Sequence, residues 1–184
     1  MNNLQQLKYM ITEHFSKSDS HNMSVGLTWY HRAHNECLLL SQVFEIELNK
    51  VVGVVAALSP NNKWSRNLHD AWNFLDEPSL DTKVCTFMNQ RKKALAILEA
   101  SSDEEILSIL NGDKTKNFFG NILYYNSSER VTVDLWAYRS VKLKPSKKNF
   151  RITELAYKEV AQDLNLQPHQ LQAVVWGVVR GAAS

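Results

Sequence analysis

Cysteine is scarce in this chain of 184 residues, which contains only Cys37 and Cys85. Each cysteine lies in an apolar pattern with helical spacing, and two are too few for a disulfide framework or a zinc site. We therefore expect a reducing compartment and no structural metal. With 44% hydrophobic residues, a chain of this length can bury a full core and fold as one domain without such cross-links.

Long apolar runs are also missing. The longest, Val51–Leu58, is far shorter than the roughly 20 residues that a membrane-spanning helix needs. The N-terminal stretch Met1–Phe15 is interrupted by Lys8, Glu13 and His14, so it lacks the apolar core of a signal peptide. The sequence therefore predicts a cytoplasmic protein without a membrane partner.

No convincing pair of strands is present, since the β-branched residues Thr132 and Val133 are isolated. Helical periodicity dominates instead, most clearly in an apolar stripe formed by Leu68, Ala71, Trp72 and Leu75. This spacing favours the core for Trp72. We find no internal repeat and no long linker. The predicted fold class is all-α, a bundle of about nine or ten helices that forms a single domain over residues 1–184.

Capping and breaking residues suggest where several helices begin and end. Ser102 and Glu105 form a capping box, Asn111-Gly112 breaks that helix, and Pro168 is typical of the first turn of the last helix. Further helices are expected at Leu4–Phe15, Trp29–Phe44, Asn49–Leu58, Lys83–Ala100, Asp134–Val141 and Arg151–Leu164. The basic segment Lys142–Lys148, which contains Pro145, is expected to form a loop.

Two segments contain candidate chemistry. Lys114 is expected at the opening of a helix, where the positive potential favours the uncharged, nucleophilic form of an amine. Taken alone, it is more often a surface lysine. Asp134 follows the apolar residues Val131, Thr132 and Val133, at the N-terminus of another expected helix. A structural N-cap explains an aspartate there without any catalysis.

Taken in order, these segments resemble the helix-hairpin-helix DNA glycosylases, particularly the endonuclease III-like members. Val51–Pro60 is similar to the family's early apolar helix with its Leu-Ser turn, and Asn89–Leu98 to the helix that leads to the hairpin. Ile106–Asn117 resembles the hairpin itself, in which Lys114-Thr115 matches the Lys-Thr pair of the lysine-bearing members. Val131–Asp134 resembles the segment with the catalytic aspartate, and Trp176–Gly181 a late helix.

The resemblance implies a fold with two helical subdomains that form a cleft, and a target nucleotide flipped into that cleft from DNA. It assigns Asp134 to stabilising positive charge on the sugar and Lys114 to attacking the sugar carbon. Asn61 matches the position that fills the space left by the flipped base, although a turn asparagine after a proline is an equal explanation. Trp64, flanked by Lys63 and Arg66, is a candidate for stacking on a base.

DNA is thus the expected partner. The candidate contacts to it are Asn61, Asn62, Lys63, Trp64, Gly112, Thr115, Lys116 and Arg139. The hairpin departs from the family in having one glycine where two are typical. The cysteine cluster that holds iron and sulfur in many relatives is absent, so no cofactor is expected. His31 and His34 are three residues apart, but nothing in the sequence supplies further metal ligands.

Three functions are compatible with the sequence. The first is a divergent, phage-encoded DNA glycosylase with abasic-site lyase activity, and the net charge of +2 permits such a polyanionic partner without demanding one. The second is a non-catalytic DNA-binding protein, or a phage DNA-hypermodification protein, of the same fold. The third is a helical protein-interaction module. An enzyme needs Asp134 in an accessible position, whereas a structural cap is satisfied by nearby backbone N–H groups.

Overall fold

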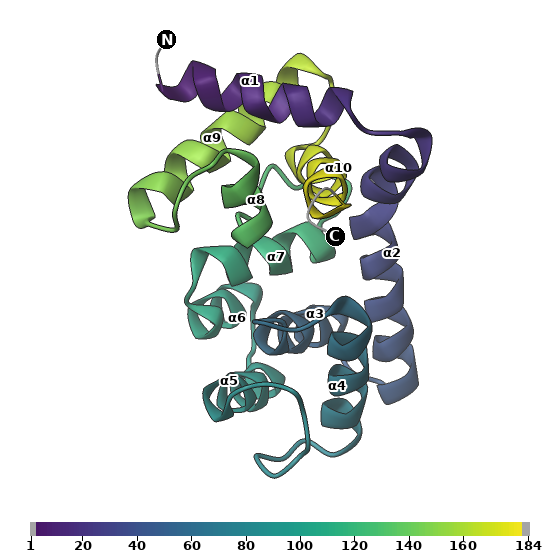
Figure 1. The fold of residues 1–184 in the computed structure, drawn as a ribbon. Helices are drawn as coiled ribbons and strands as arrows, with labels where there is room; N and C mark the ends of the chain where they lie inside the picture. Colours follow the sequence, from purple (N-terminus) through teal and green to yellow (C-terminus); the bar gives the residue numbers. More distant parts are fainter. Residues whose placement is uncertain (1–2, 182–184) are drawn as a thin grey trace. The chain divides into compact units, whose positions relative to one another are not determined.

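The computed structural model describes residues 3–181, which form ten helices and no strand (Figure 1). The predicted all-α class is confirmed. The helices are α1 (Asn3–Ser16), α2 (Ser20–Phe44), α3 (Leu48–Leu58), α4 (Trp64–Asp76), α5 (Met88–Glu99), α6 (Asp103–Leu110), α7 (Asp113–Leu123), α8 (Leu135–Ser140), α9 (Lys147–Asp163) and α10 (Pro168–Gly181).

The chain divides into two compact units. The terminal unit comprises Met1–Arg32 and Tyr124–Ser184, and the central unit comprises Ala33–Leu123. Helix α2 is shared, because its first half belongs to the terminal unit and its second half to the central unit.

The terminal unit is built from α1, α8, α9, α10 and the first half of α2. Its core joins side chains such as Ile11, Tyr157 and Leu171, all at most 1% exposed. At Gly26 of α2, an added Cβ would lie 2.6 Å from the backbone of Val174 in α10. Only glycine allows the two helices to approach this closely.

Helix α3 is the centre of the central unit. It contacts α4, α5, α6 and α7 (Figure 1), and every residue from Val51 to Leu58 is buried. An added Cβ at Gly53 would lie 2.7 Å from the side chain of Ile97 in α5. The apolar run that was too short to span a membrane is therefore the core helix of this unit.

Three helices begin at other residues than the sequence predicted. Helix α2 begins nine residues before Trp29, because the Asp19 carboxylate accepts a hydrogen bond (2.7 Å) from the backbone of Asn22 and so caps an earlier turn. Helix α5 begins at Met88 rather than at Lys83. Helix α9 begins at Lys147, since the Ser146 hydroxyl caps it.

The cysteine and tryptophan predictions also need correction. Cys85 is exposed and lies in the loop before α5, not in a helix. Trp72 is 45% exposed and packs edge-on against Phe44, with ring centroids 5.0 Å apart. The buried face of α4 is rotated away from Trp72 because it includes two polar residues, Asn67 and Asp70, which an apolar pattern does not count.

Candidate functional site

The predicted hairpin is present in the central unit as α6, the turn Asn111-Gly112, and α7. Ser102 caps α6 by accepting a hydrogen bond from the Glu105 backbone (3.3 Å). The Glu105 carboxylate accepts the return bonds from the backbone and hydroxyl of Ser101, both at 2.9 Å, and these bonds hold its pKa below the ordinary value. The capping box predicted from the sequence thus exists, although its second half reaches back to Ser101 rather than Ser102.

The turn between α6 and α7 is fixed by local bonds. Asn111 takes the left-handed conformation (φ 62°), and its N–H donates to Leu107. The ammonium of Lys93 on α5 donates to the Leu110 carbonyl (2.9 Å), which gives the C-terminus of α6 a cation. Of the two residues predicted to break the helix, Asn111-Gly112, the one with a positive φ is Asn111.

The candidate residues on the hairpin differ in their exposure. Gly112 and Lys114 are exposed, whereas Thr115 and Lys116 are half-buried. The Thr115 hydroxyl donates to the Gly112 carbonyl (3.0 Å) and so closes the first turn of α7. Lys114 therefore has its ammonium in solvent at the N-terminus of a helix, with Asp113 beside it in the same turn.

The α3–α4 turn holds the other candidates of the central unit. Asn61 is exposed with φ 60°, and Lys63 is exposed immediately before α4. Asn62 instead donates its amide to the buried Asp70 carboxylate (2.8 Å). This bond gives Asn62 a structural role in addition to the one assigned from the sequence.

Trp64 links the turn to the hairpin. Its indole N–H donates to Glu36 (2.7 Å), and its ring lies edge-on to Phe118 of α7, with centroids 6.2 Å apart. The ring is half-buried and held in place by both contacts. The structure thus brings the α3–α4 turn beside α7 within one unit.

Asp134 is the N-cap of α8 in the terminal unit. Its Oδ1 accepts a hydrogen bond from the Ala137 backbone (2.9 Å), and the side chain is half-buried. Its negative charge also reaches Tyr157, whose pKa is raised mainly by burial and further by Asp134. The structural N-cap that the sequence suggested is therefore confirmed.

Arg139, the last candidate, is an exposed residue of α8, and its guanidinium lies 4.4 Å from the ring centroid of Trp136. Like Asp134, it belongs to the terminal unit, whereas the hairpin and the α3–α4 turn belong to the central unit. The terminal unit has 12 Lys and Arg against 7 Asp and Glu, and the central unit has 9 against 12. The excess positive charge is thus in the unit that contains Asp134.

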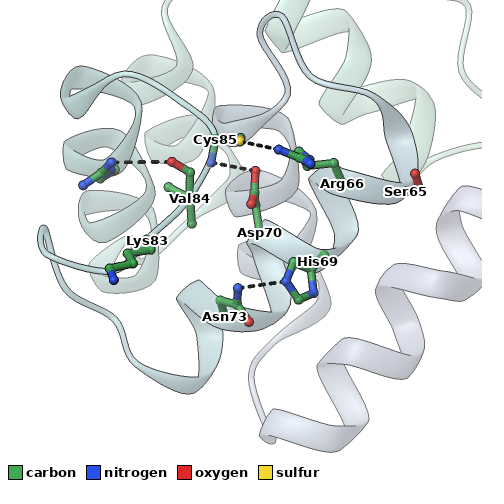
Figure 2. Close-up of a pocket in the computed structure, with 9 residues that line it drawn as sticks. Ser65, Arg66, His69, Asp70, Asn73, Lys83, Val84 and Cys85 are labelled. Atoms are coloured by element: carbon green, nitrogen blue, oxygen red, sulfur yellow. Dashed lines mark hydrogen bonds between the residues drawn. The ribbon is translucent and has the colours of Figure 1, made fainter.

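A pocket of about 630 Å³, which the sequence did not suggest, lies in the central unit between α4 and the loop before α5 (Figure 2). It is lined by Ser65, Arg66, His69, Asp70, Asn73, Lys83, Val84, Cys85 and Arg91. One signal was available, because Arg66, His69, Asp70 and Asn73 form a polar stripe with helical spacing. The contribution of the loop could not be read from that stripe.

The two histidines considered as metal ligands have other contacts. His31 stacks on Tyr125 with ring centroids 4.8 Å apart, and His34 forms a hydrogen bond with the Ile122 carbonyl. Within the described range 3–181, no three His, Cys, Asp or Glu side chains are grouped to hold a metal ion. No helix in that range combines the length and apolar character needed to cross a bilayer.

Comparison with known proteins places the chain in a family without assigning it an activity. No curated protein and no solved structure matches the chain. Residues 2–183 match a family described as a family of unknown function, DUF7178, and the chain belongs to this family.

Proposed function

We propose that this protein binds DNA through the α6–α7 hairpin and acts as a DNA N-glycosylase with abasic-site lyase activity. The observation that carries the proposal is the position of Lys114. It is exposed in the first turn of the second helix of a helix–Asn-Gly–helix hairpin, next to Thr115. In the sequence, Lys114-Thr115 resembles the Lys-Thr pair of the lysine-bearing glycosylases, and this resemblance supports the proposal.

Lys114 has the chemistry and the access that a nucleophile needs. The backbone N–H groups at the start of α7 create positive potential, which attracts a phosphate. In the proposed reaction the Nζ lone pair forms a bond to the sugar C1′, and the glycosidic bond breaks with its electrons leaving on the base. Opening of the sugar then gives a Schiff base between the sugar and Lys114.

The resemblance also assigns Asp134 to supplying negative charge. Asp134 belongs to the terminal unit and Lys114 to the central unit, so each assignment is tested by its own substitution. The Asp134 carboxylate is oriented by the Ala137 N–H and is attached to a short helix, so it is held in one place. A fixed carboxylate stabilises the oxocarbenium-like charge that develops on the sugar as the base departs. Asn61 and Lys63, both exposed in the α3–α4 turn, are assigned to DNA contact.

Borohydride trapping on DNA that contains an abasic site tests the nucleophile. Wild-type protein is expected to form a covalent adduct, and Lys114→Ala is expected to form none. Lys92→Ala is the matched control, because Lys92 is also an exposed lysine of the central unit, on α5. An adduct that persists in Lys114→Ala, or is lost equally in both variants, would exclude Lys114 as the nucleophile.

A non-catalytic DNA-binding protein is the second candidate, and the hydrogen bond between Asp134 and Ala137 favours it, because a cap alone explains that carboxylate. In this case Asp134→Asn leaves DNA affinity unchanged, and neither the wild type nor the variant releases a base. Binding through Lys63, Lys114 and Lys116 would give a slope of log K against log[salt] of about −3. The absence of both salt-dependent binding and an adduct would reject both candidates.

A further inference from the structure

The pocket of the central unit has a charge excess that its own carboxylate does not balance. Arg66, Lys83 and Arg91 line it, and Asp70 is the one acid among the lining residues. Within residues 3–181, none of the three cations forms an ion pair with a carboxylate. His69 adds an imidazole ring to the lining. A cationic pocket of this kind attracts an anion from solution.

The walls of the pocket are held by hydrogen bonds rather than left loose. Asp70 is 4% exposed, and its Oδ2 accepts from the Asn62 amide (2.8 Å) and from the Cys85 backbone (3.0 Å). Arg91 donates to the carbonyls of Leu80 (2.9 Å) and Val84 (3.5 Å). The loop is therefore tied to α4 by a buried carboxylate and to α5 by a guanidinium.

The cations have different roles. Arg91 donates two N–H groups to loop carbonyls, so its role is mainly structural. Its Nε is buried and has no hydrogen-bond partner. Arg66 donates one N–H to the Cys85 sulfur (2.8 Å), which leaves most of its five donors available. Lys83 is exposed, and Figure 2 shows it on the opposite side of Asp70 from Arg66. Arg66 and Lys83 are thus the cations that remain for a ligand.

We propose that this pocket binds a phosphate monoester, with Arg66 and Lys83 as the groups that contact the phosphate. A phosphate monoester is close to a dianion at pH 7, because its second pKa is about 6, and it offers three acceptor oxygens. Arginine pairs with such oxygens through a planar fork of donors, and lysine acts as a point charge. Asn73 and His69, which form a hydrogen bond with each other (3.3 Å), are placed to meet sugar hydroxyls.

The size and the lining of the pocket limit the rest of the ligand. A volume of about 630 Å³ admits a molecule as large as a mononucleotide. Most of the lining residues have a polar or charged side chain, so the ligand is expected to offer hydrogen-bonding groups. The phosphate can come from a free nucleotide or from the terminal phosphate of a DNA strand. Neither Lys114 nor Asp134 lines the pocket, so this proposal does not depend on the glycosylase proposal.

Binding of AMP, compared with adenosine, tests the phosphate requirement. We expect calorimetry to detect AMP and not adenosine. Arg66→Ala and Lys83→Ala should each weaken AMP binding about tenfold, since each removes a charge-assisted contact. Lys92→Ala, an exposed lysine of the same unit that does not line the pocket, should bind AMP like the wild type. AMP affinity that is equal in Arg66→Ala, Lys83→Ala and wild type would overturn the proposal.

Cys85 provides a second measurement that needs no substitution. It is exposed at the pocket, whereas Cys37 is buried and its pKa is raised by burial to about 12. Iodoacetamide should therefore alkylate Cys85 alone, and AMP should slow that reaction. Protection by a 5′-phosphorylated oligonucleotide, but not by its 5′-hydroxyl counterpart or by AMP, would also support the phosphate monoester and would assign it to a strand end. Failure of both AMP and the phosphorylated oligonucleotide to protect Cys85 at about 1 mM would overturn the proposal.

Discussion

Substitution of Asp134 separates its role as a helix cap from any role in catalysis. Its Oδ1 accepts the Ala137 N–H at 2.9 Å, which satisfies one of the otherwise unpaired donors at the start of α8. Asp134→Ala removes this bond, and loss of an N-cap costs about 1 kcal/mol of unfolding free energy. For a protein of this size that corresponds to a fall in Tm of about 2–4 °C. Asparagine also caps helices well, so Asp134→Asn should unfold near the wild-type midpoint.

Urea unfolding of the three proteins measures the difference. The midpoint should fall for Asp134→Ala while the slope m stays constant, because the unfolded chain exposes the same surface. Ser146→Ala, which removes the cap of α9 in the same unit, should cost a similar amount. If Asp134→Asn is as unstable as Asp134→Ala, the cap is not the stabilising interaction. If Asp134→Asn is stable but no longer releases a base, the negative charge is what the reaction requires.

Two further predictions concern packing and titration in the terminal unit. Gly26→Ala should lower the unfolding free energy by about 1–3 kcal/mol, because the added Cβ would lie 2.6 Å from the Val174 backbone. Urea unfolding measures this change, and a variant as stable as wild type would refute the close approach of the two helices. His169 is 1% exposed, and burial lowers its pKa, so the native state excludes a proton that the unfolded chain binds below pH 6.5. Stability should therefore fall as the pH is lowered through about 6.5, and less steeply in His169→Gln. Equal losses in the two proteins would show that His169 is not responsible.

The sequence was sufficient for features that depend on neighbouring residues. The capping box of Ser102 and Glu105, the break at Asn111-Gly112 and the N-cap at Asp134 all use atoms within a few residues of each other. Local hydrogen-bond rules predict such contacts well. The start of α2 was missed although its signal was also local, because the cap at Asp19 is followed by few apolar residues.

The remaining features depend on contacts between distant residues. The sequence suggested Trp64 as a candidate for stacking on a base. It did not suggest that the indole N–H donates to Glu36 of α2 or that the ring lies edge-on to Phe118 of α7. The helix expected from Lys83 is a loop up to Phe87, because Asp70 of α4 binds its backbone at Cys85. No periodicity within a single segment could have revealed these partners.

The central-unit pocket follows from one departure from the rule that core faces are apolar. Helix α4 buries Asn67 and Asp70 on the same face as Phe74. The amide N–H of Asn67 donates to the Val55 carbonyl (3.1 Å) while its Oδ1 has no hydrogen-bond partner, and the Asp70 carboxylate accepts from the loop backbone at Cys85. A buried carboxylate is costly unless it is hydrogen-bonded, so Asp70 favours the loop conformation that satisfies it. That conformation exposes Cys85 and brings Lys83 to the same pocket as Arg66. Asp70, the polar residue that interrupts the apolar stripe of α4, is therefore the residue that holds the loop in the conformation that forms the cationic pocket.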